Sequence, residues 1–99
     1  MQVNDSQTLV LCVLADGPKH GYAINGAIER LTGERLGPGS LYGALTRLEA
    51  KGFVEHLAGE GRQRPVRLTA EGRAALEAEL RTMAHVAAVG LRNLGASPA

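Results

Sequence analysis

The apolar residues in the first third of the chain predict two helices separated by a break. An apolar run at residues 9–14 follows three residues that can each cap a helix, Asn4, Asp5 and Ser6. Asp16-Gly17-Pro18 then ends this helix. Residues 20–31 carry apolar side chains at helical spacing before Thr32-Gly33 ends the second segment. The first helix is therefore expected to be buried on most sides, and the second to be amphipathic.

A glycine-rich turn, Gly37-Pro38-Gly39-Ser40, leads into a predicted third helix that Gly52 closes. Leu41, Leu45 and Leu48 form its apolar stripe, which must face the core. The opposite face is small, polar and basic. It consists of Gly39, Ser40, Gly43, Thr46 and Arg47, with Tyr42 and Lys51 on its flanks.

The middle of the chain predicts a β-hairpin. Residues 53–58 alternate apolar and polar side chains, and Val66-Arg67-Leu68 begins a returning strand. The residues between them, which include Arg62, Gln63 and Arg64, are expected to form an exposed tip. Pro65 cannot donate a hydrogen bond to a ladder, so the returning strand is expected either to lie at a sheet edge or to start just after the proline.

A long last helix is predicted from Thr69, which can cap it, and Glu71, which favours its positive end. Its apolar residues recur every three or four positions, as in a coiled coil. A domain this small has little core left to cover such a helix, so we expect it to pair with a second copy. The expected dimer interface consists of Leu9, Val13, Leu76, Leu80, Met83, Ala87, Leu91 and Leu94.

Bulk properties indicate one compact globular domain. The 99 residues are 44% hydrophobic and 21% charged, and no apolar stretch approaches the roughly 20 residues of a membrane span. The N-terminus lacks the features of a secretory signal, and Cys12, without a partner in the chain, suits a reducing compartment. We therefore expect a cytoplasmic protein with no membrane partner. Residues 19–69 hold eight of the eleven Lys and Arg but five of the ten acids, a weak basic footprint.

Catalytic and metal chemistry find little support in the sequence. His20, His56 and His85 lie in separate predicted elements without acidic or thiol partners at ligand spacing. No nucleophile with a base, phosphate-binding Gly-Lys loop or carboxylate pair is visible. We expect no enzyme activity, no cofactor and no metal.

The predicted fold class is mainly α with a small β-hairpin: a winged helix-turn-helix plus a C-terminal dimerisation helix. Residues 1–69 are expected to form the DNA-binding domain, residues 70–95 the dimerisation helix, and residues 96–99 a disordered tail. In such folds the third helix enters the major groove of double-stranded DNA. Ser40, Thr46 and Arg47 can bond phosphates or base edges, and Gly43 lets the helix backbone approach the groove closely. Arg62, Gln63 and Arg64 could reach a flanking minor groove or its phosphates.

Several segments together resemble the PadR family of bacterial regulators, over nearly the whole chain. The resemblance lies in Gly17-Pro-Lys-His-Gly-Tyr22, in Gly39-Ser-Leu-Tyr followed by Arg-Leu-Glu and Gly52, and in Arg67-Leu-Thr-Ala-Glu-Gly72. It implies a dimeric winged-helix repressor, often responsive to a small molecule, whose C-terminal helix pairs with its partner. The short C-terminus resembles the subfamily with a single such helix.

By the same resemblance, Tyr22, Ser40, Tyr42 and Arg47 fall on positions expected near DNA, and the wing tip falls at residues 62–64. The chain departs from the family pattern in two places. Pro65-Val66-Arg67 stands where aromatic residues often precede Leu-Thr, and there is no tryptophan to stack on flat aromatic drugs.

Two functions from different classes follow. The leading one is a sequence-specific regulator that binds a pseudo-palindromic operator as a homodimer, acting as a repressor that a small-molecule effector could release. The alternative is a winged-helix protein-interaction module without DNA binding, which uses its basic face against an acidic partner. Salt-dependent binding to duplex DNA separates the two.

Overall fold

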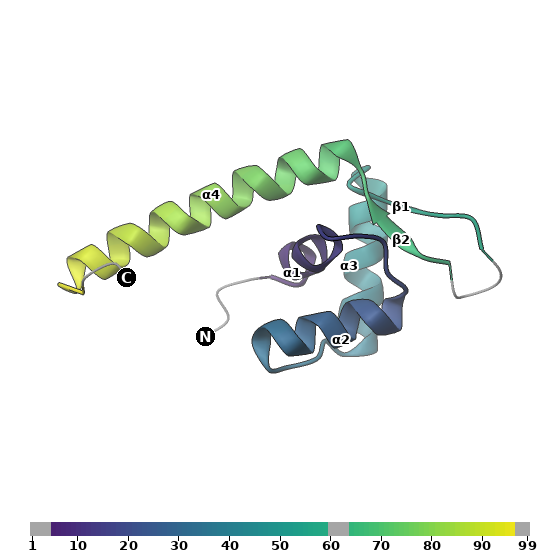
Figure 1. Cartoon of the computed structure of the whole chain (residues 1–99), viewed down its shortest axis with the longest axis horizontal. Helices are drawn as coiled ribbons and strands as arrows, with labels where there is room; N and C mark the ends of the chain where they lie inside the picture. The colour runs from purple at the N-terminus through teal and green to yellow at the C-terminus, as the bar shows by residue number, and fades with distance from the viewer. Residues whose placement is uncertain (1–4, 60–63, 97–99) are drawn as a thin grey trace.

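The computed structural model describes residues 5–59 and 64–96, and it confirms the mainly helical fold with one antiparallel hairpin (Figure 1). The elements are, in order, α1 (Ser6–Leu14), α2 (Gly21–Thr32), α3 (Pro38–Ala50), β1 (Val54–His56), β2 (Val66–Leu68) and α4 (Ala70–Asn93). This is the order of a winged helix-turn-helix, with α2 and α3 as the helix-turn-helix and the hairpin as the wing.

Local chemistry sets the helix boundaries much as the sequence predicts. The Asp5 carboxylate accepts a 2.8 Å hydrogen bond from the Thr8 backbone N–H and begins α1. Gly33, in the left-handed region at φ 86°, ends α2, and Pro38 occupies the first turn of α3. The Thr69 hydroxyl accepts from the Gly72 N–H, 3.0 Å away, and begins α4.

The wing is a short ladder in which Val54 pairs with Leu68 and His56 with Val66. The returning strand starts directly after Pro65, as one alternative predicted. β2 is also an outer strand of the two-stranded sheet, as the other alternative predicted, although Val66 at its start forms an isolated bridge with Lys19. The Val66 N–H donates to the Lys19 carbonyl at 2.8 Å, and the Lys19 N–H donates back at 3.1 Å. The start of β2 is therefore also bonded to the segment that leads into α2.

The core is built around α1, which packs against α2, α3, α4 and β2. The sequence interpretation of α1 as a buried helix is confirmed, since Leu9, Val10, Leu11, Val13 and Leu14 are all buried. The stripe predicted on the third helix also faces this core, with Leu41, Leu45 and Leu48 buried. These contacts fix the outward face of α3, because a helix that buries one stripe must expose the opposite one.

The last helix leaves the core soon after it begins. Leu76 is its last core residue, and α4 then extends away from the other elements (Figure 1). Leu80, Val86, Leu91 and Leu94 are exposed apolar side chains on this projecting part. In the described part of the chain, no helix has both the length and the apolar character needed to span a membrane. Of the tail expected at 96–99, only Ala96 is described.

Candidate DNA-binding surface

The outward face of α3 presents the small, polar and basic residues that the sequence places there. Gly39, Ser40, Thr46 and Arg47 are exposed and Gly43 is half-buried. The Thr46 hydroxyl donates a 2.9 Å hydrogen bond to the Tyr42 carbonyl one turn earlier, which leaves its oxygen free to accept. Ser40 lies in the first turn, where backbone N–H groups have no partner within the helix.

Gly43 makes room for the Arg47 side chain. A Cβ built at Gly43 would lie only 3.1 Å from the Arg47 Nη1, so the guanidinium lies along the helix directly over the glycine. A larger residue at position 43 would force the arginine aside. The interpretation of Gly43 as a point of close approach remains a prediction, and the structure adds this second role.

The amino end of α2 adjoins the same face through two tyrosines. A Cβ built at Gly21 would lie 3.7 Å from the Tyr42 hydroxyl oxygen, so the Tyr42 ring packs on α2. Tyr42 still exposes 62% of its surface, and Tyr22 exposes 83%. Exposed phenols beside the helix face that carries Arg47 suit hydrogen bonding to phosphate. Tyr22 and Tyr42 therefore form one exposed surface that joins the outward face of α3 to the start of α2.

A groove of about 590 Å³ runs between α2, the outer face of α3 and the wing. Among the residues that line it are His20, Tyr22, Tyr42, Thr46, His56 and Arg64. Nδ1 of His56, on β1, lies within hydrogen-bond distance of the Glu49 carboxylate on α3. This contact links β1 of the wing to α3 at the groove.

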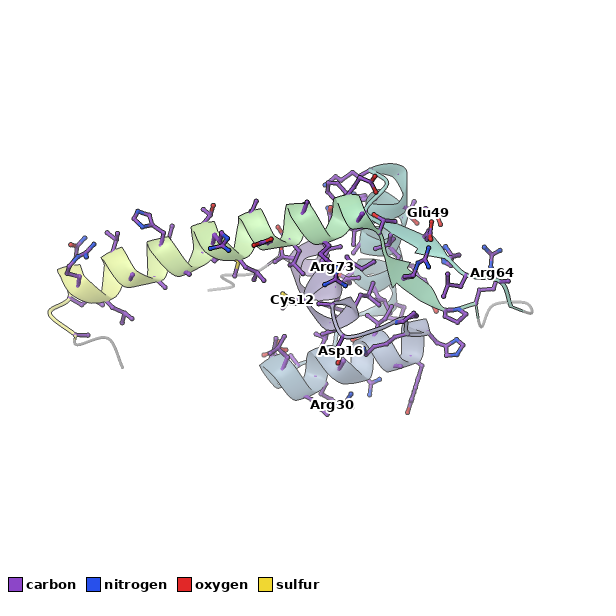
Figure 2. The ribbon with its side chains drawn as sticks, turned by 45° about the horizontal axis from the view of Figure 1, so that its top comes forward. Cys12, Asp16, Arg30, Glu49, Arg64 and Arg73 are labelled. Atoms are coloured by element: carbon purple, nitrogen blue, oxygen red, sulfur yellow. The ribbon has the colours of Figure 1, made fainter. Side chains whose placement is uncertain are left out.

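Of the three DNA contacts predicted on the wing, Arg64 lies within the described residues. Arg64 is exposed and lies on the part of the wing that points away from α4 (Figure 2). Arg62 and Gln63 lie outside the described residues. Arg67 of β2 forms a cross-strand ion pair with Glu55 of β1, so its charge is partly neutralised. Arg64 is thus the described wing cation next to the groove.

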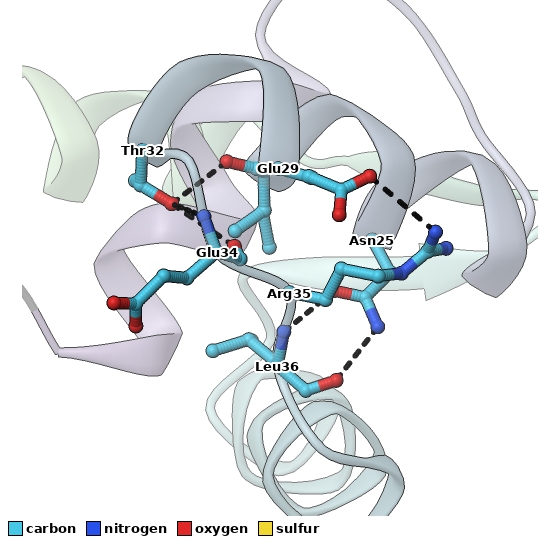
Figure 3. Close-up of polar contacts among 7 residues, drawn as sticks. Asn25, Glu29, Thr32, Glu34, Arg35 and Leu36 are labelled. Carbon is cyan, nitrogen blue, oxygen red and sulfur yellow. Dashed lines mark hydrogen bonds and ion pairs between the residues drawn. The ribbon is translucent and has the colours of Figure 1, made fainter.

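The turn between α2 and α3 is held by side chains that the sequence interpretation passed over. The Asn25 amide donates to the Leu36 carbonyl at 2.7 Å and accepts from the Leu36 N–H at 2.8 Å (Figure 3). The Thr32 hydroxyl donates to the Ile28 carbonyl and accepts from the Glu34 N–H. These bonds fix the angle at which the chain enters α3. An asparagine inside an amphipathic helix was the available signal for them.

Lys51 is the predicted contact that the structure sets apart from the others. It follows α3 as its C-terminal cap, and its ammonium donates a 2.7 Å hydrogen bond to the Gln7 amide oxygen on α1. The amino end of α3, where Ser40 lies, is therefore at the opposite end of the helix from Lys51. Its role at DNA stays a prediction.

Two ionisable groups have shifted pKa values outside this face. A hydrogen bond from the Lys19 ammonium, followed by the charge of that ammonium, lowers the pKa of the Asp16 carboxyl. Burial raises the pKa of the Cys12 thiol, which lies half-buried against the core. In residues 5–59 and 64–96, no three His, Cys, Asp or Glu side chains gather as a metal site would need.

The predicted dimer residues fall into two groups. Leu9, Val13 and Leu76 are buried in the core of their own chain, so the monomer presents little of their surface to a partner. The remaining members, which lie on the projecting part of α4, are exposed or half-buried: Leu80, Met83, Ala87, Leu91 and Leu94.

The helix-turn-helix, the exposed basic face of α3 and the adjoining wing define a winged-helix DNA-binding protein. Residues 10–78 match the model of the transcriptional regulator PadR-like family, which covers more than half of the chain. The chain belongs to this family of DNA-binding transcriptional regulators, which are not enzymes.

Solved structures agree with this assignment. A PadR family transcription regulator of Clostridium difficile R20291 is 26% identical, with a TM-score of 0.78 over 90% of this chain and 97% of that one. A transcriptional regulator from Clostridium thermocellum is 27% identical, with a TM-score of 0.78 over 87% of this chain and 89% of that one. RosR of H. salinarum is 32% identical, with a TM-score of 0.73 over 83% and 74%.

A longer relative has much higher identity. An uncharacterized 37.1 kDa protein in transposon TN4556 of Streptomyces fradiae is 64% identical over 86 residues. The match covers 87% of this chain and 25% of that protein, so the chain spans about a quarter of the length of this curated relative.

Proposed function

We propose that the protein is a sequence-specific transcriptional repressor that binds a pseudo-palindromic operator in the cytoplasm as a homodimer. The observation that carries the proposal is the continuous surface formed by the outward face of α3, the two tyrosines and Arg64 of the wing. Phosphate contacts from Ser40, the tyrosines and Arg64 supply most of the affinity. Base contacts from the middle of α3 supply the specificity.

Arg47 is the residue we expect to read a base. Its guanidinium can pair in a bidentate fashion with the acceptor edge of guanine. Arg47→Ala should weaken binding to an operator selected from a random pool by about 1–3 kcal/mol and relax specificity at one position. Arg30→Ala is the matched control, because it removes the same side chain from an exposed position of α2. Arg30 adjoins Asp16 and lies outside the α3 face. Equal losses in the two variants, or none in either, would refute the base-reading role.

The homodimer rests on α4, whose apolar stripe projects beyond the core. A long helix with exposed leucines is poorly stabilised alone, and pairing it with a second copy buries the stripe. Two copies would place their α3 helices about 34 Å apart, one turn of duplex. A groove of about 470 Å³ under α4, with Leu76 and Leu80 in its lining, is where we place a small-molecule effector.

The homodimer is tested by sedimentation velocity on paired variants. Leu91→Asp puts a charge in the stripe, whereas Ala78→Asp puts the same charge on the opposite side of α4, where Ala78 is exposed. We expect Leu91→Asp to shift the protein to monomer and Ala78→Asp to leave the dimer intact. A dimer that survives Leu91→Asp, or a monomeric unmodified protein, would contradict this interface.

A further inference from the structure

Arg35, in the turn between α2 and α3, is a cation that lies outside the α3 face, the two tyrosines and the wing. Its guanidinium carbon lies 5.5 Å from the centre of the Tyr22 ring, and its Nη1 lies 3.5 Å from a Glu29 carboxylate oxygen. Figure 3 shows the carboxylate of Glu29 reaching from α2 toward the guanidinium. The side chain is thus held between an aromatic face and an acid, yet 41% of it remains exposed.

This arrangement lies on the side of α2 that adjoins the start of α3. Tyr22 and Glu29 are seven residues apart in α2, so they share one face of the helix, with Asn25 between them. Asn25 binds the Leu36 backbone, which leads into α3. Arg35 therefore lies next to the amino end of α3, on the surface continued by Tyr22.

We propose that Arg35 is a phosphate-binding residue of the DNA surface, and that it exchanges the Glu29 carboxylate for a DNA phosphate when the protein binds. This inference rests on the proposed DNA-binding function. A half-exposed ion pair is weak in water, so Glu29 orients the guanidinium in the free protein without retaining it. A phosphate matches the planar donor fork of arginine as a carboxylate does. The Tyr22 ring supports the guanidinium in both states.

Glu29 has a second consequence for binding. When Arg35 binds a DNA phosphate, the Glu29 carboxylate is left without its partner near the phosphates and repels them. Glu29 therefore restrains DNA binding, and its removal should release Arg35 for phosphate. Glu34 offers a comparison, because it is an exposed acid of the same turn that makes no ion pair within residues 5–59 and 64–96.

The first part of the test uses a random-sequence duplex, since phosphate contacts carry no sequence information. Each phosphate contact contributes about 0.9 to the slope of log affinity against log salt. Arg35→Gln should weaken binding, and the ratio of unmodified to variant affinity should shrink about 3.5-fold per lost contact between 50 and 200 mM salt. Arg30→Gln removes the same charge from an exposed position of α2 that adjoins Asp16, and it should leave the slope unchanged.

The second part is a double-mutant cycle. Glu29→Gln should raise affinity for the same duplex more than Glu34→Gln does, and this additional gain should vanish in the Arg35→Gln background. Circular dichroism and melting temperature establish that each variant is folded.

The outcomes separate the two proposals. Salt-sensitive binding by the unmodified protein, together with equal slopes for Arg35→Gln and Arg30→Gln, would overturn the role of Arg35 and leave the DNA-binding proposal standing. An equal gain from Glu29→Gln in both backgrounds would overturn the exchange with Glu29. Absence of DNA binding by the unmodified protein at low salt would overturn both proposals.

Discussion

Gly72, in the first turn of α4, is the position at which the smallest substitution should do the most damage. A Cβ built there would lie 2.0 Å from the Phe53 carbonyl oxygen and 2.8 Å from its carbon. Both are backbone atoms, which cannot rotate away as the end of a side chain can. Gly72→Ala must therefore move the start of α4 away from the residue that precedes β1.

The cost can be worked from the contacts at this junction. Ordinary contact begins near 3.4 Å, so the helix start must shift by roughly 1 Å or more. The Thr69 N–H donates to the Phe53 carbonyl at 3.0 Å, and the Thr69 hydroxyl donates to the Gly52 carbonyl at 2.6 Å. Both hydrogen bonds stretch when the helix start shifts. Overpacking costs about 1–3 kcal/mol, and each weakened bond about 1 kcal/mol. The higher helix propensity of alanine returns about 1 kcal/mol, leaving a net loss of about 2–4 kcal/mol.

Gly26→Ala is the matched control, because Gly26 lies inside α2 and a Cβ there would meet only the end of the Arg30 side chain, at 3.6 Å. This variant should be neutral or stabilised by up to about 1 kcal/mol. In thermal unfolding at one protein concentration, Gly72→Ala should melt roughly 10–30 °C lower than the unmodified chain. Equal melting temperatures for the two alanine variants would refute the steric argument.

Two further predictions concern stability. Asn25→Ala removes both hydrogen bonds to the Leu36 backbone, and it should lower the free energy of unfolding in urea by about 1–2 kcal/mol, because water can replace part of what is lost; an unchanged urea midpoint would contradict this role of the amide. The Lys19 contact lowers the folded-state pKa of Asp16, so the contact stabilises the fold at pH values above the unfolded-state pKa of about 4. This stabilisation is lost as the pH falls through the lower pKa of the folded state. Asp16→Asn should therefore flatten the dependence of the urea midpoint on pH below about pH 4, and a curve parallel to that of the unmodified protein would count against the assignment.

The features that the sequence predicts well are those fixed by local chemistry. The spacing of Leu41, Leu45 and Leu48 determines which side of α3 is buried, and hence which side is exposed. Thr69 caps α4 and Gly33 ends α2, because a hydroxyl and a left-handed glycine act on neighbours within one turn. The exposed face of α3 could be predicted for the same reason.

The features that could not be predicted depend on contacts between distant segments. The bridge between Lys19 and Val66 joins segments that are far apart in the chain, so it could not be predicted from the residues around Pro65. The bond from Lys51 to Gln7 on α1 likewise depends on how α3 packs. No sequence pattern indicates a role for Arg35, because its position is set by contacts with Tyr22 and Glu29 on a neighbouring helix.

The most direct test of the account is fluorescence anisotropy of the purified protein titrated onto labelled duplexes from its own upstream region. A scrambled duplex serves as control, and each titration is made at two salt concentrations. We predict saturable binding that is tighter than to the scrambled duplex and weakened by salt, because phosphate contacts dominate affinity and α3 supplies specificity. Failure to bind either duplex at low salt would contradict the DNA-binding function and favour a protein-interaction module.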